Sequence, residues 1–135
     1  MAIVDNGCGF LATLSEHPEL IDKTDCGAIR AALKPRVSCN RGSLARVLGS
    51  ENQGVGLTTT AKIAEAAGGG LIVASGNAIH QTEYGRFHEM DERGWQGVSI
   101  GFYCVRELLP GVSISALLPA DEDGQDELEL DLNFR

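Results

Sequence analysis

An acidic residue and two alternating glycines follow a short apolar run near the N-terminus. The run Ala2–Val4 leads into Asp5-Asn6-Gly7-Cys8-Gly9, a D-x-G-x-G pattern. Glycines at alternate positions allow left-handed backbone angles and a close approach to a flat ligand. A carboxylate beside them can accept a hydrogen bond from an exocyclic amino group, which favours adenine over analogues without that donor. The competing interpretation is a hairpin turn, because Asn-Gly is a strong hairpin signal, and this motif alone leaves both open.

A second glycine motif, Gly54-Val55-Gly56-Leu57-Thr58-Thr59-Thr60, stands at the start of a predicted helix. The first turn of a helix has unpaired N–H groups and the positive end of the dipole, so it binds phosphate readily. The glycines remove side chains that would block a phosphate, and Thr58 could add a hydroxyl donor. Taken alone, this motif is better interpreted as an ordinary capped helix after a loop.

The remaining chemistry-bearing residues show no metal-site spacing. The histidines form no helical pair and the cysteines form no C-x-x-C pair, so we predict no structural metal site; these residues are His17, His80, His88, Cys8, Cys26, Cys39 and Cys104. Arg41 and Arg46 could bind a phosphate bidentately, although charges in such a loop are more commonly just solvated.

Length and charge exclude several classes of protein. The chain has 135 residues, which fits one domain, and a net charge of −8. Seven acidic residues lie in the segment 120–135, which leaves 12 acidic against 10 basic residues elsewhere. A nucleic-acid-binding surface needs a clustered basic patch, and the sequence has none, so we expect no nucleic-acid partner. No apolar run approaches the roughly 20 residues that span a bilayer, and no secretion signal is present, so we expect a cytoplasmic protein.

The elements that must position the two motifs follow from hydrophobic periodicity. We predict helices at about 18–33 and 54–67, separated by a Ser/Gly/Asn/Arg-rich loop at 36–53. Predicted strands cover 2–4, 71–75, 98–105, 112–118 and 127–134, with 77–81 continuing the second strand after a kink or bulge at Gly76. Strands grouped after helices indicate an α+β, two-layer sandwich whose mixed, mostly antiparallel sheet packs against the helices.

The order of these features resembles the GHKL superfamily of ATP-binding domains, which have the Bergerat fold and include histidine kinases and type II topoisomerases. Residues 3–9 look like its first glycine box, 54–57 look like its second, and 36–53 take the place of its ATP lid. The similarity extends over residues 1–119, as a partial histidine-kinase-like domain. It is followed by an acidic C-terminal segment, 120–135, with an amphipathic strand at 127–134.

The resemblance implies that the chain binds ATP, in a bacterial regulatory or signalling protein. By position, it implies that Asp5 binds the adenine amino group and that Gly7 and Gly9 line the base. The same comparison implies that backbone N–H groups of the second box contact the phosphates and that Thr58 assists them; the box residues are Gly54, Gly56 and Leu57.

The sequence departs from the family pattern at two places. The family's asparagine box, whose Asn binds Mg²⁺, lies on a helix before the first glycine box, and no such helix precedes Asp5 here. Mg²⁺ is therefore expected for the family without its usual ligand, and ATPase or kinase chemistry would require that segment to be supplied. The second departure is at Gly97-Val98, where the family often has Gly-Thr with the hydroxyl near the adenine; Val98 cannot make that contact.

An alternative function follows from the first departure. Loss of that helix would expose apolar sheet surface and an unpaired strand edge, which favour self-association. The alternative is a non-catalytic interaction module that forms a homodimer through this edge and has lost nucleotide binding.

Overall fold

A five-stranded antiparallel sheet forms one layer of the protein in the computed structural model, which describes residues 1–37, 56–91 and 94–118. The strands lie in the order β1-β5-β2-β3-β4. Their bounds are β1 Ala2–Val4, β2 Gly70–Gly76, β3 Ala78–Gln81, β4 Arg86–Glu89 and β5 Trp95–Tyr103. All four strand pairings are antiparallel within these residues. The expected α+β class is confirmed, whereas the expected mixed sheet is wrong for the described strands.

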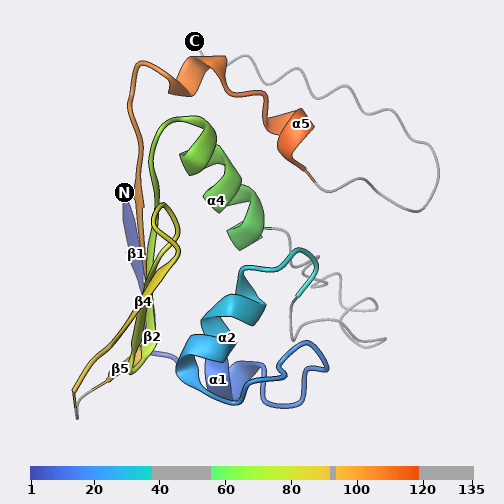
Figure 1. The fold of residues 1–135 in the computed structure, drawn as a ribbon, viewed down its shortest axis with the longest axis vertical. Coiled ribbons are helices and arrows are strands. Elements are labelled where there is room, and N and C mark those ends of the chain that lie inside the picture. Colours follow the sequence, from blue (N-terminus) through green and yellow to red (C-terminus); the bar gives the residue numbers. More distant parts are fainter. Residues whose placement is uncertain (38–55, 92–93, 119–135) are drawn as a thin grey trace, which may run out of the picture.

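Helices form the second layer, on one face of the sheet (Figure 1). They are α1 Gly9–Thr13, α2 Asp25–Ala32 and α4 Gly56–Ala66. The fully buried strand residues Leu71 and Val73 meet Ile29 of α2 and Ala64 of α4 in one core cluster. Each large apolar side chain buried in this way contributes roughly 1.5–3 kcal/mol. Burial of one sheet face beneath the helices therefore holds both layers together.

The helix predicted at 18–33 is shorter in the structure, and that expectation is corrected to Asp25–Ala32. Thr24 is its N-cap, and the Thr24 hydroxyl accepts a hydrogen bond from Gly27 N at 3.0 Å. Such a cap fixes where a helix begins because it satisfies a first-turn N–H group. Residues before the cap form turns, in which Leu20 is buried while Ile21 is 86% exposed.

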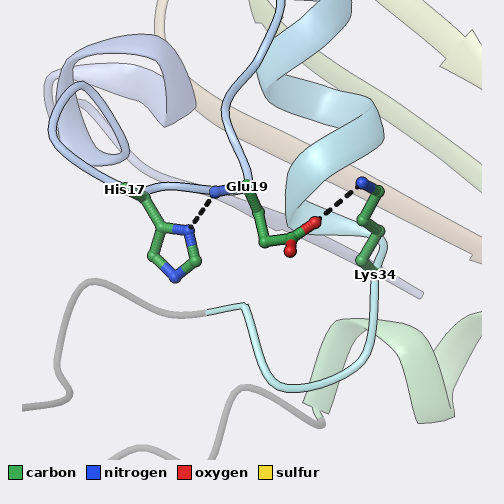
Figure 2. A network of polar contacts seen from close by, with 3 residues as sticks. All are labelled: His17, Glu19 and Lys34. Carbon is green, nitrogen blue, oxygen red and sulfur yellow. Dashed lines mark hydrogen bonds and ion pairs between the residues drawn. The ribbon is translucent and has the colours of Figure 1, made fainter.

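The segment before α2 is tied to the other end of that helix by polar contacts. Figure 2 shows Glu19 between His17 and Lys34. Lys34 Nζ lies 2.9 Å from Glu19 Oε2, and Glu19 N donates to His17 Nδ1 at 3.1 Å. The hydrogen bond from Lys34 lowers the pKa of Glu19. Because both side chains of the ion pair are about half exposed, the pair orders the loop but adds little stability.

The chain reverses at Gly76 and Asn77 instead of continuing as one kinked strand, which corrects the expectation for 77–81. Ser75 pairs with Ala78, so β2 and β3 form a hairpin with a two-residue connection. Gly76 has a φ of 61°, and Asn77 N donates to Asp25 Oδ2 at 3.0 Å. A left-handed residue suits a tight hairpin. The carboxylate of Asp25 at the start of α2 then fixes this turn against the helical layer.

The strand predicted at 112–118 is also wrong. This segment follows a 3₁₀ turn at Leu109–Gly111 and contains the short helix α5, Ile114–Leu117. Both edges of β5 are already paired, one with β1 and the other with β2, so a strand following β5 has no place beside it. Val105 N instead donates to Ala67 O at 2.8 Å, which directs the chain over the end of α4.

Several expectations fall outside the described residues. They are residues 38–53 of the lid predicted at 36–53, which include Cys39, Arg41 and Arg46, as well as Gly54 and the strand at 127–134. Among the described residues, no helix is long and apolar enough to cross a membrane.

His80 is a buried histidine on the helix-facing side of β3. It is 8% exposed and its ring stacks on Phe87, with the centroids 4.1 Å apart. The guanidinium group of Arg30, in α2, lies over the Phe87 ring, 4.4 Å from the ring centroid. The Nδ1 atom of His80 lies 2.9 Å from the Arg86 carbonyl oxygen, to which Nδ1–H donates. Burial lowers the pKa of His80, and the charge of Arg30 lowers it further.

We therefore expect the protein to lose stability as the pH falls through the ordinary histidine range. A folded-state pKa below the unfolded value of about 6.5 means that the unfolded chain binds the proton more tightly. Urea unfolding between pH 7.5 and 5.5 should show a decrease in the free energy of unfolding that His80→Gln reduces. The exposed His88→Gln controls for loss of a histidine. A wild-type pH dependence unchanged in His80→Gln would contradict the assignment.

Candidate functional site

The Asp5 carboxylate lies where β1 ends, and β5 holds it in place. Asp5 N donates to Val98 O at 2.9 Å. In return, Asp5 Oδ1 accepts hydrogen bonds from Val98 N at 3.1 Å and from Gly7 N at 2.8 Å. Oδ2 has no hydrogen-bond partner among the described residues, and Asp5 is exposed. One carboxylate oxygen is thus fixed by the backbone while the other can accept a hydrogen bond from a ligand.

Glycines surround this carboxylate. Gly9 and Gly97 are buried and have φ angles of 79° and 102°. A Cβ atom on Gly97 would lie 2.3 Å from the Asp5 carbonyl oxygen and 2.7 Å from its Oδ1. A Cβ atom on Gly7 would lie 3.1 Å from the same Oδ1. Asp5 and Gly7 therefore lie beside Gly97 of β5, which also approaches Gly9. Gly97 precedes Val98 at the position that the resemblance associates with the adenine.

The first motif does not form a hairpin, and that interpretation is wrong. After Gly9 the chain enters α1, and the partner of β1 is the distant β5. Phe10 N, at the beginning of α1, donates to the side-chain oxygen of Ser75 at 2.9 Å. The contact joins residues 65 positions apart, so no local pattern could have indicated it.

The second motif begins α4 on the same side of the sheet (Figure 1). Gly56 is exposed, and a Cβ atom placed on it would meet nothing within 4 Å. Leu57 packs against both core clusters of the protein, and so does Phe10. Phe10 follows Gly9 and Leu57 follows Gly56, and both side chains pack against the same two core clusters. This packing anchors both motifs in the helical layer. Gly54 lies outside the described residues.

Thr58 has a packing role in this arrangement. It is 7% exposed, and its hydroxyl donates to the Leu33 carbonyl oxygen at 2.9 Å. A hydroxyl has one proton to donate, so donation to a phosphate would require this bond to break. The bond joins the beginning of α4 to the end of α2.

A cavity of about 280 Å³ lies at the opposite end of β2 from Asp5, lined by Glu65, Gly68, Gly69, Thr82 and Glu83. Beside it, Tyr103 donates its hydroxyl proton to Glu83 at 2.5 Å, which raises the pKa of Tyr103 to about 12. This cavity does not include any of the residues of the two glycine motifs.

Residues that could bind a metal ion are not clustered in the described part of the chain. Within residues 1–37, 56–91 and 94–118, no three His, Cys, Asp or Glu side chains come together as a metal site. A Mg²⁺ ion bound with phosphates needs only one or two protein oxygens, so this finding concerns sites built from protein ligands alone.

Comparisons with known proteins identify no related protein or family. No protein-family model matches the chain. Comparison with curated proteins and with solved structures gives no significant match either. The functional interpretation of this site therefore depends on its residues and on the geometry described above.

Proposed function

We propose that this chain is a cytoplasmic adenine-nucleotide-binding protein of the GHKL type, with the base at Asp5 and the phosphates toward the beginning of α4. The observation that carries the proposal is the hydrogen bonding of the Asp5 carboxylate, in which only one of the two oxygens is used by the described residues. Two backbone N–H groups hold Oδ1, at 2.8 and 3.1 Å, and leave Oδ2 for a ligand. An anionic acceptor of fixed orientation selects a ligand with an N–H donor at the matching place, such as the 6-amino group of adenine.

The surroundings of Asp5 support a flat ligand. Gly7, Gly9 and Gly97 place no side chain beside the carboxylate, and at Gly97 even a methyl group would overlap with Asp5. An aromatic base can approach a backbone of this kind closely. The choice of a planar donor, such as a purine, comes from the resemblance, and the absence of side chains at these glycines is compatible with it.

The beginning of α4 supports a phosphate end for the ligand. α4 has 11 residues, and its first-turn N–H groups lack intrahelical acceptors. Gly56 is exposed, so no side chain at this position blocks the approach of an anion to these groups. The proposal covers nucleotide binding. The phosphoryl-transfer step that the resemblance implies is not part of it.

Calorimetric titration with ATP and with purine riboside 5′-triphosphate tests the proposal. The second compound differs from ATP only in lacking the 6-amino group. We expect ATP to bind and the analogue to bind about 10- to 100-fold more weakly, because a hydrogen bond to a charged group contributes about 1.5–3 kcal/mol. Equal affinity for the two compounds would contradict the role of Asp5, and no binding of ATP would contradict the function.

A second candidate function, self-association, is favoured by the exposed edge of the sheet. β1 pairs only with β5 among the described strands. Its residues Ile3 and Val4 are 62% and 57% exposed. An exposed apolar edge strand can pair with a second copy of the chain. A stable dimer that binds no ATP in the same titration would favour this function over nucleotide binding.

A further inference from the structure

A buried serine from β2 contacts the end of the Asp5 turn. Ser75 is 1% exposed, and its Oγ accepts a hydrogen bond from Phe10 N at 2.9 Å. The same oxygen would lie 3.0 Å from a Cβ atom on Gly9. Ser75 Oγ is therefore packed directly against the last glycine of the first motif.

This contact replaces a cap that α1 does not provide for itself. Cys8, at the N-cap position of α1, makes no side-chain capping bond. The first N–H groups of a helix lack intrahelical acceptors and need another partner. Ser75 supplies that partner to Phe10 from a different layer of the fold, so the place where the turn ends and α1 begins is determined by β2.

The turn is consequently held by one side chain at each end. At its beginning, Asp5 Oδ1 binds Gly7 N and Val98 N. At its end, Ser75 Oγ binds Phe10 N. Between these points lie two glycines, which have more backbone freedom than other residues. Without the second attachment, Gly7 and Gly9 could take other positions, and a ligand would have to order them when it binds.

We propose that Ser75 is a positioning residue for nucleotide binding: it holds the glycine turn in the conformation that accepts the base. This inference rests on the proposed function. Ser75 acts through Phe10 and Gly9 and does not itself touch the ligand. Loss of its hydroxyl should therefore reduce affinity through the order of the turn.

Ser75→Ala and a matched control, Thr82→Ala, test the proposal. Thr82 Oγ1 accepts a hydrogen bond from Leu71 N at 2.8 Å, so both variants remove a hydroxyl that accepts from a backbone N–H, at opposite ends of β2. We expect Ser75→Ala to weaken ATP binding roughly 10-fold, the size expected for one unmade hydrogen bond. Thr82→Ala should bind ATP as the wild type does. The affinity of Ser75→Cys for ATP should lie between those of the wild type and Ser75→Ala, because a thiol is a weaker acceptor of similar size. If Ser75→Ala does not fold, Ser75→Cys is tested in its place.

Amide hydrogen exchange separates positioning from a general loss of stability. Positioning requires faster exchange of the Phe10 amide in Ser75→Ala, with the Val73 amide in the core unchanged. An equal increase at Phe10 and Val73 would show a merely structural role and overturn the proposal. Wild-type affinity for ATP in Ser75→Ala would also overturn it while leaving the proposed function intact. Failure of the wild type to bind ATP would instead remove the function and the role of Ser75 together.

Discussion

Asp5→Asn should leave the fold intact and weaken ATP binding by about 100-fold. An asparagine keeps an oxygen in the place of Oδ1, so the hydrogen bonds from Gly7 N and Val98 N can persist. Its NH₂ group takes the place of Oδ2 and presents donors to the donor on the base. The loss of one charged hydrogen bond, about 1.5–3 kcal/mol, corresponds to roughly 10- to 100-fold in affinity. The facing donors put the expected effect at the upper end of that range.

Asp5→Ala provides the structural comparison for this experiment. It removes both acceptor contacts of Oδ1, so we expect it to lower the free energy of unfolding by about 1–3 kcal/mol in addition to abolishing binding. Calorimetry with ATP and urea unfolding of each variant separate the two effects. Wild-type affinity in Asp5→Asn would exclude Asp5 as the contact to the base. A large loss of stability in that variant would show that the negative charge, and not the oxygen, maintains the turn.

Gly97→Ala should be among the most destabilising substitutions of a single residue in this protein. The added Cβ atom would lie 2.3 Å from the Asp5 carbonyl oxygen, and the φ of Gly97 is 102°. Backbone strain of this kind costs about 1–3 kcal/mol, and an overlap that forces the backbone to shift costs about the same again. We therefore expect a loss of about 3–5 kcal/mol in the free energy of unfolding, measured by urea unfolding. Weaker ATP binding should accompany it, because Asp5 must move.

Gly101→Ala in the same strand is the matched control. A Cβ atom on Gly101 would lie 3.8 Å from Ile72 Cβ, an ordinary contact distance. Replacing glycine inside a strand reduces the entropy of the unfolded chain, so this variant should be as stable as the wild type or up to about 1 kcal/mol more stable. Similar losses in both variants would show that β5 rejects any side chain, and that the close approach between Gly97 and Asp5 has no special role.

Several features of the fold could be predicted because they depend on short-range patterns. The apolar run Ala2–Val4 is a strand, and the periodic segment after the second motif is a helix at Gly56–Ala66. The three glycines after that helix end it, with Gly68 at a φ of 71°. Asp5, Gly7 and Gly9 can be proposed together for the same reason, since a motif of five residues contains them all.

Other features depend on which strand lies beside which. The segment 112–118 has the alternation of a strand, yet it is not one, because β1 and β2 already occupy both edges of β5. A glycine at position 76 is compatible with a bulge and with a turn. The structure has a register shift against β5 at Ser75/Gly76 and also a turn into β3, which the contact of Asn77 with Asp25 supports. Local periodicity carries no information about such competition for partners.

Local sequence patterns are enough to predict the α+β class and the elements on which the glycine motifs lie, and they mark Asp5 as the acid proposed to bind an amino group. The tertiary structure adds that Val98 N holds the Asp5 carboxylate, that Gly97 leaves room for Asp5, and that Ser75 caps the helix after the first motif. These contacts join residues 93 and 65 positions apart. They exist because β1 and β2 pair with opposite edges of β5, and an arrangement of distant strands is decided by packing of the whole core.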